Sequence, residues 1–325
     1  MSKAIRIHKT GGPEVLRWDD VTVGGLQAGE VRLRQTAVGL NFIDTYHRSG
    51  LYPVEALPTV IGMEGAGVVE EIGDNVQGFQ VGDRVAYAGG PIGSYAVERR
   101  MPAARLVKLP DTIDDQHGAA LMLKGLTTHY LVRRCYHVKP GDTILIHAAA
   151  GGVGLLVCQW AKHLGATVIG TVSTRAKAEL AGSHGCDHPI LYRDESFVGR
   201  VRELTNGEGV PVVYDSVGRD TIDDSLDCLR PLGLMVTFGQ SSGPVPPLAI
   251  HELTAHGSLF LTRPTLATYT ATREQLLANA AELFDVVEKG VVKIEINQTY
   301  PLQNAEQAHR DLESRKTTGA TVLLP

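Results

Sequence analysis

The sequence predicts an α/β protein with two domains: a doubly wound parallel sheet in the middle of the chain and a discontinuous β-rich domain formed by its two ends. Between residues 143 and 263, short apolar runs alternate with helical patterns, which is typical of parallel strands joined by helices. The first hundred or so residues hold short alternating segments punctuated by glycine and proline, which is typical of a compact β domain. We place residues 1–122 and 267–325 in the β-rich domain and residues 123–266 in the other.

Composition narrows the class of protein. The 325 residues, 43% of them hydrophobic, suffice for about two buried cores, and the net charge of −5 argues against a general nucleic-acid or anionic-membrane surface. No apolar run approaches the roughly 20 residues of a membrane span, and the N-terminus lacks the apolar core of a signal peptide. The four cysteines form no C-x-x-C pair. We expect a cytoplasmic protein with reduced thiols and with neither a membrane nor a nucleic acid as its primary partner.

The stretch from Thr143 to Val172 is predicted to be a strand, a glycine turn, a helix and a second strand. In the turn, Ala149 takes the first position of the G-x-G-x-x-G pattern, and Gly151-Gly152-Val153-Gly154 supplies the other two glycines. Gly151 lets the backbone approach a pyrophosphate, and Gly154 lets the helix pack close to the strand. Free N–H groups at the helix start face the anion. This combination predicts a dinucleotide site.

The end of the second strand indicates which dinucleotide binds. An NAD site usually has Asp or Glu there to accept a hydrogen bond from the ribose 2′-OH. This chain has no carboxylate there but two hydroxyls and two cations, in Ser173, Thr174, Arg175 and Lys177. The pattern favours NADPH over NADH. The alternative is that Arg175 and Lys177 are solvated residues that open the next helix.

A polar aromatic segment lies between two strands of the β-rich domain. Residues 39–53 are expected to form one loop that holds Asn41, Asp44, Tyr46, His47 and Tyr52. These amide, carboxyl and phenol groups suit a flat ligand that bears oxygen atoms. Alternatively, the side chains hold the loop together by hydrogen bonds among themselves.

The rest of the chain completes the two domains. We expect a helix over 114–134, buried strands near 211–218 and 233–243, a helix over 273–289, a strand over 293–296, a helix near 304–314 and a strand over 320–324. The last strand is expected to rejoin the N-terminal β-rich domain.

Ten ordered motifs across the chain make a family resemblance specific. They include GGPEVL (11–16), NFIDTYHRSGLYP (41–53), VGDRV (81–85), KGLTTHYL (124–131), HAAAGGVGL (147–155) and GLMVTFGQSSG (233–243). The sequence resembles the zinc-independent quinone oxidoreductases of the medium-chain dehydrogenase/reductase superfamily, and in particular the bacterial enzymes; ζ-crystallin belongs to the same group. The resemblance implies a Rossmann domain that binds NADPH and a GroES-like catalytic domain.

The resemblance also implies roles for residues and an assembly. The residues expected at the pyrophosphate are Gly151, Gly152, Val153 and Gly154, and those expected at the 2′-phosphate are Ser173, Lys177, Tyr192 and Arg315. The nicotinamide half is expected to contact Phe238, Gly239, Gln240, Ser241, Leu261, Thr262 and Arg263, with Thr127 and Tyr130 also beside the cofactor. The quinone is expected to contact Asn41, Asp44, Tyr46 and Tyr52. A homodimer is implied through the edge strand of the nucleotide domain, for which Gly233–Phe238 is the candidate segment.

The same superfamily contains zinc alcohol dehydrogenases, whose ligand pattern differs from this sequence. Their first zinc ligand is a cysteine near the position of Asn41, and their G-H-E motif here reads Gly62-Met63-Glu64. A thioether does not replace an imidazole as a zinc ligand, and no cysteine cluster follows Asp83. We therefore expect no metal site. No G-x-S-x-G elbow suggests a hydrolase either.

Without a metal, the predicted chemistry comes from NADPH, and the protein aligns the nicotinamide with the acceptor. Asn41, Tyr46 and Tyr52 are the predicted catalytic residues, because their side chains can donate hydrogen bonds to the oxygens of a quinone. One alternative is an enone or enoyl reductase in which a tyrosine supplies a proton. Another is an RNA-binding or structural role, as in relatives of ζ-crystallin, but the acidic balance and the absence of a basic stripe oppose it.

Overall fold

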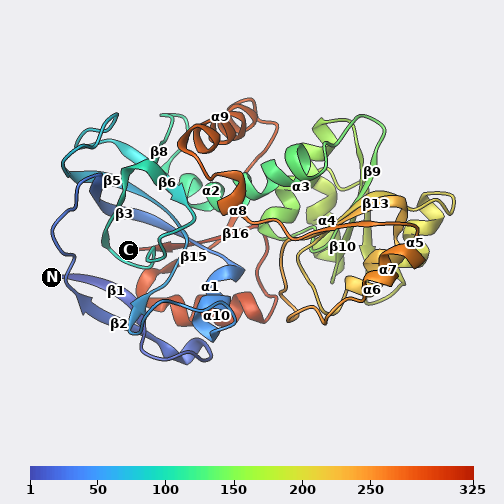
Figure 1. Ribbon diagram of the computed structural model, residues 1–325, viewed down its shortest axis with the longest axis horizontal. Helices are drawn as coiled ribbons and strands as arrows, with labels where there is room; N and C mark the ends of the chain where they lie inside the picture. The colour runs from blue at the N-terminus through green and yellow to red at the C-terminus, as the bar shows by residue number, and fades with distance from the viewer. The chain divides into compact units, whose positions relative to one another are not determined.

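The computed structural model describes residues 1–325 and divides into two compact units (Figure 1). The first unit comprises residues 1–126, 270–288 and 294–325, and the second comprises residues 127–269 and 289–293. Both ends of the chain therefore contribute to the first unit.

A six-stranded parallel sheet forms the centre of the second unit. Its strands are β9 (Thr143–Ile146), β10 (Thr167–Val172), β11 (His188–Leu191), β12 (Val210–Asp215), β13 (Leu229–Thr237) and β14 (Phe260–Thr262). Their order is β11-β10-β9-β12-β13-β14, and every neighbouring pair is parallel. The order changes direction at β9, as in a doubly wound Rossmann sheet. The predicted fold class is confirmed for this part of the chain.

Helices connect these strands: α3 (Gly152–His163), α4 (Arg175–Ser183), α5 (Phe197–Leu204), α6 (Ile222–Asp227) and α7 (Ile250–Ala255). The short helix α8 (Leu266–Tyr269) follows β14. One core cluster joins Leu145, Val213 and Met235 of the sheet to Phe197 of α5 and Ile222 of α6. Strands covered by helices on both faces need apolar residues at nearly every position. This requirement explains the unbroken apolar runs seen in the sequence.

The edges of this sheet are β11 and β14, which corrects one expectation from the sequence. Residues 233–238 were expected at the edge, but residues 233–237 belong to β13, which pairs with β12 on one side and β14 on the other. The short strand β14 pairs in parallel with β13 and forms hydrogen bonds with its backbone. Gly233–Phe238 is therefore not an edge segment.

The first unit is mostly antiparallel. Strands β1 (Ser2–Ile7), β2 (Leu16–Val21) and β4 (Thr59–Val60) form one sheet; β3 (Glu30–Leu40), β5 (Glu64–Ile72), β6 (Arg84–Ala88), β7 (Glu98–Pro102), β8 (Val107–Lys108), β15 (Ile296–Pro301) and β16 (Ala320–Leu324) form the other. Figure 1 shows the C-terminal strand β16 beside the N-terminal β3, and Leu323 pairs with Val38 across them. The expected return of the last strand to the N-terminal β-rich domain is confirmed.

Four helices of eight or more residues begin in this unit: α1 (Phe42–Ser49), α2 (Asp115–Tyr130), α9 (Arg273–Glu288) and α10 (Ala305–Glu313). The strand expected over 293–296 is instead β15, which begins at Ile296 and pairs in parallel with β16. Half-buried and exposed residues alternate along β15, because one face of this edge strand meets solvent. The apolar run before it misled the prediction.

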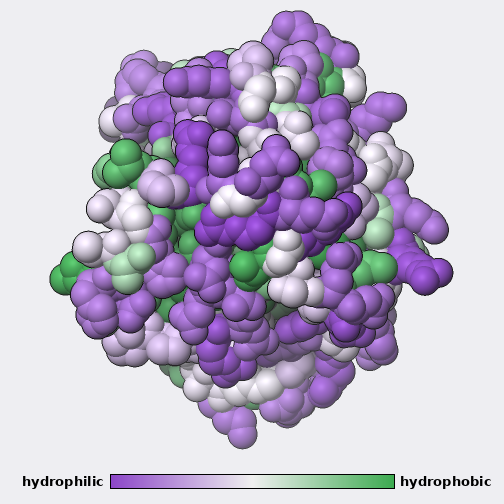
Figure 2. Space-filling view, turned by 90° about the vertical axis from the view of Figure 1, so that its right-hand side faces the viewer, coloured by the Kyte–Doolittle hydropathy of each residue, from purple (hydrophilic) through white to green (hydrophobic).

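None of the helices combines the length and the apolar character that crossing a membrane requires. On the face shown in Figure 2, hydrophobic residues form small groups among hydrophilic ones.

Candidate active site

The turn between β9 and α3 leads to the free backbone N–H groups at the start of helix α3. Gly151 is the N-cap of α3, in an extended conformation with φ −82° and ψ 173°. A Cβ on Gly154 would lie 2.3 Å from the carbonyl oxygen of Ala148, so only glycine allows this contact. The first N–H groups of a helix lack partners within it and attract anions. The turn therefore fits a pyrophosphate, and Gly152 and Val153 are the first two residues of α3.

The ends of β10 and β11 bring three predicted 2′-phosphate residues near one another. Ser173 directly follows β10, and Thr174 caps α4 by accepting a hydrogen bond at 3.3 Å from the backbone N–H of Lys177. The backbone N–H of Tyr192, just after β11, donates to the carbonyl oxygen of Val172 at 3.3 Å. Residues 173–178 contain no carboxylate. Arg315, in contrast, belongs to the first unit, after α10.

The exits of β13 and β14 lie side by side and hold the residues predicted for the nicotinamide half. Arg263 Nη1 donates to the carbonyl oxygens of Gly239, at 2.8 Å, and Thr237, at 3.2 Å. A Cβ on Gly239 would lie 2.6 Å from the carbonyl oxygen of Ser216, so this turn packs directly on the exit of β12. The structure thus places 238–241 beside 261–263 at the carboxyl edge of the sheet.

A buried polar network ties the strand ends together beneath these turns. The Asp215 carboxylate accepts the hydroxyl of Thr221 at 2.7 Å and that of Ser225 at 3.3 Å, and Ser225 Oγ lies 2.9 Å from His147 Nε2. His147 Nδ1 lies 2.9 Å from Thr171 Oγ1. Burial lowers the pKa of His147, with Asp215 opposing it, so the imidazole is neutral at neutral pH. The network fixes the ends of β9, β10 and β12 relative to one another.

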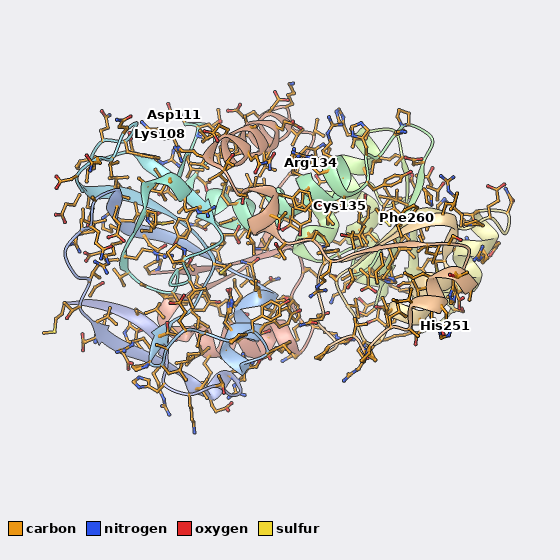
Figure 3. The ribbon with its side chains drawn as sticks, in the orientation of Figure 1. Lys108, Asp111, Arg134, Cys135, His251 and Phe260 are labelled. Carbon is orange, nitrogen blue, oxygen red and sulfur yellow. The ribbon has the colours of Figure 1, made fainter.

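Thr127 and Tyr130 lie at the end of α2, within the second unit. The Tyr130 ring stacks on that of Tyr269, with centroids 4.7 Å apart and planes 14° apart. Burial raises the pKa of the Tyr130 phenol, while a hydrogen bond with Thr127 acts in the opposite sense. Tyr269 Oη in turn contacts Cys135 Sγ at 3.2 Å; Cys135 is labelled in Figure 3. Stacking and hydrogen bonding hold both predicted residues in fixed positions.

The predicted loop at residues 39–53 contains a helix, so the expectation of one loop is wrong. Asn41 is the N-cap of α1, and Asp44 accepts its backbone N–H at 2.9 Å in a capping box. Gly50 ends the helix in the left-handed conformation, with φ 84°. The polar residues at 41 and 44 are thus the helix's own cap. The abundance of polar and aromatic groups obscured that pattern.

Asn41 meets two further polar residues from other elements. Asn41 Nδ2 donates to Glu64 Oε2 at 2.8 Å, and Lys124 Nζ donates to the same oxygen at 3.0 Å. The backbone N–H of Leu123 donates to the other oxygen, Glu64 Oε1, at 2.6 Å. Glu64 has no exposed surface, and the Lys124 side chain is 8% exposed. The start of α1, the start of β5 and the middle of α2 therefore converge on one carboxylate.

Asp44 begins a second polar chain in this unit. Its Oδ2 accepts the hydroxyl of Tyr95 at 3.1 Å, and Tyr95 Oη lies 3.0 Å from His309 Nε2. His309 Nδ1 lies 2.9 Å from Arg48 Nη1, and Arg48 forms a bidentate ion pair with Glu313. Burial raises the pKa of Asp44 to about 7, against hydrogen bonds that lower it. Asp44 Oδ1 is buried with no hydrogen-bond partner.

Tyr46 and Tyr52 form an aromatic pair next to this cap. Their ring centroids are 5.2 Å apart and their planes meet at 66°, while the backbone N–H of Tyr52 donates to the carbonyl oxygen of Tyr46 at 3.0 Å. His47 lies against Tyr52 with centroids 6.0 Å apart, and burial lowers the pKa of His47. All four residues predicted for the quinone thus belong to α1 or the segment that packs on it.

Sequence reasoning missed Lys124, Tyr95 and His309 as members of the polar networks around Asn41 and Asp44. Lys124 carries the one signal that was available, because it is the only charged residue in the apolar run from Ala119 to Leu126. Tyr95 and His309 are 214 residues apart, and no local pattern connects them.

Comparison with known proteins agrees with this architecture. Residues 27–111 match the alcohol dehydrogenase GroES-like domain, and residues 152–279 match the zinc-binding dehydrogenase family. A quinone oxidoreductase of Pseudomonas aeruginosa is 54% identical over 325 residues, and a 2-haloacrylate reductase of a Burkholderia species is 49% identical over 331 residues; the matches cover 100% of this chain and 100% and 99% of the relatives. The structure of Escherichia coli quinone oxidoreductase complexed with NADPH superposes with a TM-score of 0.98 at 48% identity, covering 99% of this chain and 100% of that one.

These matches extend over the whole chain, and they agree with a Rossmann sheet joined to a GroES-like unit. The chain therefore belongs to the quinone oxidoreductase family of the medium-chain dehydrogenase/reductase superfamily.

Proposed function

We propose that this protein is an NADPH-dependent quinone oxidoreductase that catalyses quinone + NADPH + H⁺ → hydroquinone + NADP⁺. The observation that carries the proposal is the glycine turn before α3, followed by a strand end with hydroxyls and cations but no carboxylate. The relatives named above support it, since one is a quinone oxidoreductase and a similar structure holds NADPH.

The second unit supplies the cofactor site in this proposal. The turn from Gly151 to Gly154 holds the pyrophosphate, Ser173, Lys177 and Tyr192 hold the 2′-phosphate, and Arg315 adds a further cation. Residues 238–241 and 261–263 line the nicotinamide half, and Thr127 and Tyr130 contact the cofactor from α2. When bound, NADPH supplies a hydride equivalent.

The first unit supplies the acceptor site. Asn41, Tyr46 and Tyr52 are the proposed catalytic residues, with Asp44 bordering the substrate. The contact between the two tyrosine rings and the cap of α1 support this assignment, because they hold polar groups in place on and beside one short helix. The functional division of the chain is then 1–122 and 267–325 for the acceptor and 123–266 for NADPH.

We propose that the reaction uses no zinc. Asn41 and Met63 stand where related alcohol dehydrogenases have zinc ligands, and the structure contains no group of three His, Cys, Asp or Glu side chains that could hold a metal ion. Asn41 instead hydrogen bonds to Glu64. This donor set suits a hydrogen-bonded site and not a zinc site.

A second candidate function is reduction of an activated alkene. The observation that favours it is the 49% identity to a 2-haloacrylate reductase over the whole chain. Hydride addition to an alkene conjugated to a carbonyl also places negative charge on oxygen, so the same donors can serve both reactions.

The proposed assembly is a homodimer formed through the edge strand β14. Phe260 and Leu261 on this strand are 60% and 41% exposed, and Phe260 is labelled in Figure 3. Large apolar side chains on an unpaired edge favour pairing with a second copy. A cytoplasmic location, with neither membrane nor nucleic acid as a primary partner, agrees with the net charge of −5 and four free cysteines.

The test is NADPH oxidation followed at 340 nm with 1,4-benzoquinone, a naphthoquinone and an enone, using NADH as the control and a chelator-treated sample. We expect fast, chelator-resistant turnover with the quinones and a strong preference for NADPH. Activity confined to the enone would replace the quinone with the alkene, and loss of activity on chelation would refute the zinc-free assignment.

A further inference from the structure

We propose that the ammonium of Lys124 stabilises the negative charge that develops on the substrate oxygen, and that Glu64, to which Asn41 donates a hydrogen bond, holds this ammonium in place. The inference rests on the proposed function. It adds a charged group to the acceptor site, where the sequence had indicated only amide and phenol donors.

Neighbouring groups hold the Glu64 carboxylate in the position from which it binds this ammonium. A Cβ on Gly39 would lie 2.3 Å from the carbonyl oxygen of Ala119 and would also collide with Glu64 Oε2, so glycine at 39 makes room for the carboxylate. The backbone N–H of Leu123 and the amide of Asn41 each bind one carboxylate oxygen. Glu64 is therefore immobile, and it fixes the Nζ of Lys124 relative to the start of α1.

Lys124 also differs chemically from Asn41 as a donor. The Asn41 amide nitrogen already contacts Glu64 Oε2 at 2.8 Å and the carbonyl oxygen of Gly39 at 3.4 Å. The amide is neutral, so it offers a substrate oxygen only a dipole. The Lys124 ammonium bears a full charge in a buried setting, where charge–charge interactions are stronger than in water. Lys124 lies close enough to α1 to act on buried Asp44: burial is the main cause of the raised pKa of Asp44, Lys124 lowers that pKa, and Glu64 raises it.

A fixed positive charge favours the proposed reaction. Hydride transfer to a quinone leaves one ring oxygen as an anion until a proton arrives from solvent. A fixed cation beside that oxygen lowers the energy of the charged state without having to reorganise. Because the cation acts on charge that is absent from the ground state, it affects kcat more than KM.

The alternative is that Lys124 and Glu64 form an ion pair that only stabilises the fold. Removing one partner of a buried pair leaves an uncompensated charge and destabilises a protein. The double variant Glu64→Gln/Lys124→Met removes both charges and keeps similar volumes, so it separates folding from catalysis.

The experiment compares wild type with Lys124→Met, Lys124→Arg and the double variant. Lys108→Met is the matched control, because Lys108 pairs with Asp83 at 2.8 Å but its side chain is 51% exposed; Lys108 is labelled in Figure 3. Steady-state kinetics with 1,4-benzoquinone, the NADPH Kd from fluorescence and the melting temperature are measured for each.

We expect kcat to fall about 100-fold in both Lys124→Met and the double variant, with the NADPH Kd within about 2-fold of wild type. Lys124→Arg should retain kcat within about 10-fold, because it keeps the charge, and Lys108→Met should match wild type. A folded double variant with kcat within about 3-fold of wild type would overturn the inference while leaving the proposed function intact. A wild type that is inactive with every quinone would instead refute the proposed function.

Discussion

The hydroxyl of Tyr95 donates to Oδ2 of Asp44 at 3.1 Å, and both side chains are completely buried. The donor and acceptor roles in the series of hydrogen bonds that ends at Asp44 follow from Arg48, because its guanidinium can only donate. His309 Nδ1 must accept from Arg48, so its Nε2 carries the proton and donates to Tyr95 Oη. Burial holds the pKa of His309 at about 3, which keeps the ring neutral and this orientation fixed.

Tyr95→Phe should destabilise the protein by about 1–3 kcal/mol, because it leaves buried polar atoms of Asp44 and His309 without their partner. Urea unfolding measures the change. Tyr300→Phe is the control, since Tyr300 Oη bonds to Asp311 at 3.0 Å at a half-buried position and should cost less than about 1 kcal/mol. Equal losses in the two variants would show that the buried chain has no special role in stability.

Asp44 should make stability depend on pH. Its pKa in the folded protein is about 7, against an ordinary value of 3.8, so between these values the native state holds a proton that the unfolded state has lost. Stability from this group is therefore present at low pH and lost as the pH rises through 7, by about 4 kcal/mol in total. The difference in unfolding free energy between wild type and Asp44→Asn should fall from pH 4 to pH 8. Parallel curves over that range would contradict the prediction.

Gly154→Ala should weaken NADPH binding roughly 10-fold and cost about 1–3 kcal/mol of stability, because the new Cβ meets backbone that cannot move aside. Isothermal titration and thermal unfolding measure the two effects. Gly182→Ala on α4 is the matched control: nothing lies within 4 Å of its added Cβ, so stability should stay equal or rise by up to about 1 kcal/mol. Unchanged NADPH affinity in Gly154→Ala would argue against this turn as the pyrophosphate site.

Ser173→Asp should raise the NADPH Kd about 10- to 100-fold and leave the NADH Kd within about 3-fold, because the carboxylate repels a 2′-phosphate and accepts from a 2′-hydroxyl. Fluorescence titration with both nucleotides gives the ratio. Ser183→Asp adds the same charge at the exposed far end of α4 and should change neither value. An equal effect of the two substitutions would assign the change to net charge alone.

Phe260→Glu should convert a dimer into monomers, because it places a charge on the exposed edge strand β14. Sedimentation equilibrium measures the mass. Ile250→Glu is the control, since Ile250 is 85% exposed but lies on the helix α7 and not on a strand of the sheet. A dimer that persists in Phe260→Glu would place the interface elsewhere.

The Rossmann half of the protein could be predicted from the amino-acid sequence. Strand, turn and helix around Gly151 and Gly154 are local in sequence, and the spacing of the glycines reflects contacts within a few residues. The missing carboxylate after β10 is equally local. Such features can be predicted from the sequence because the residues that interact are close together in the chain.

The polar contacts around the proposed acceptor site became visible only in the folded chain. Asn41, Glu64 and Lys124 come from three elements, and Tyr95 meets His309 across 214 residues. Their polar atoms pair because burial forces each to find a partner, and the sheet pairing of β3, β5 and β16 decides which partners are near. Sequence spacing carries no record of these pairings, so the partners of Lys124 and His309 could be recognised only in the folded chain.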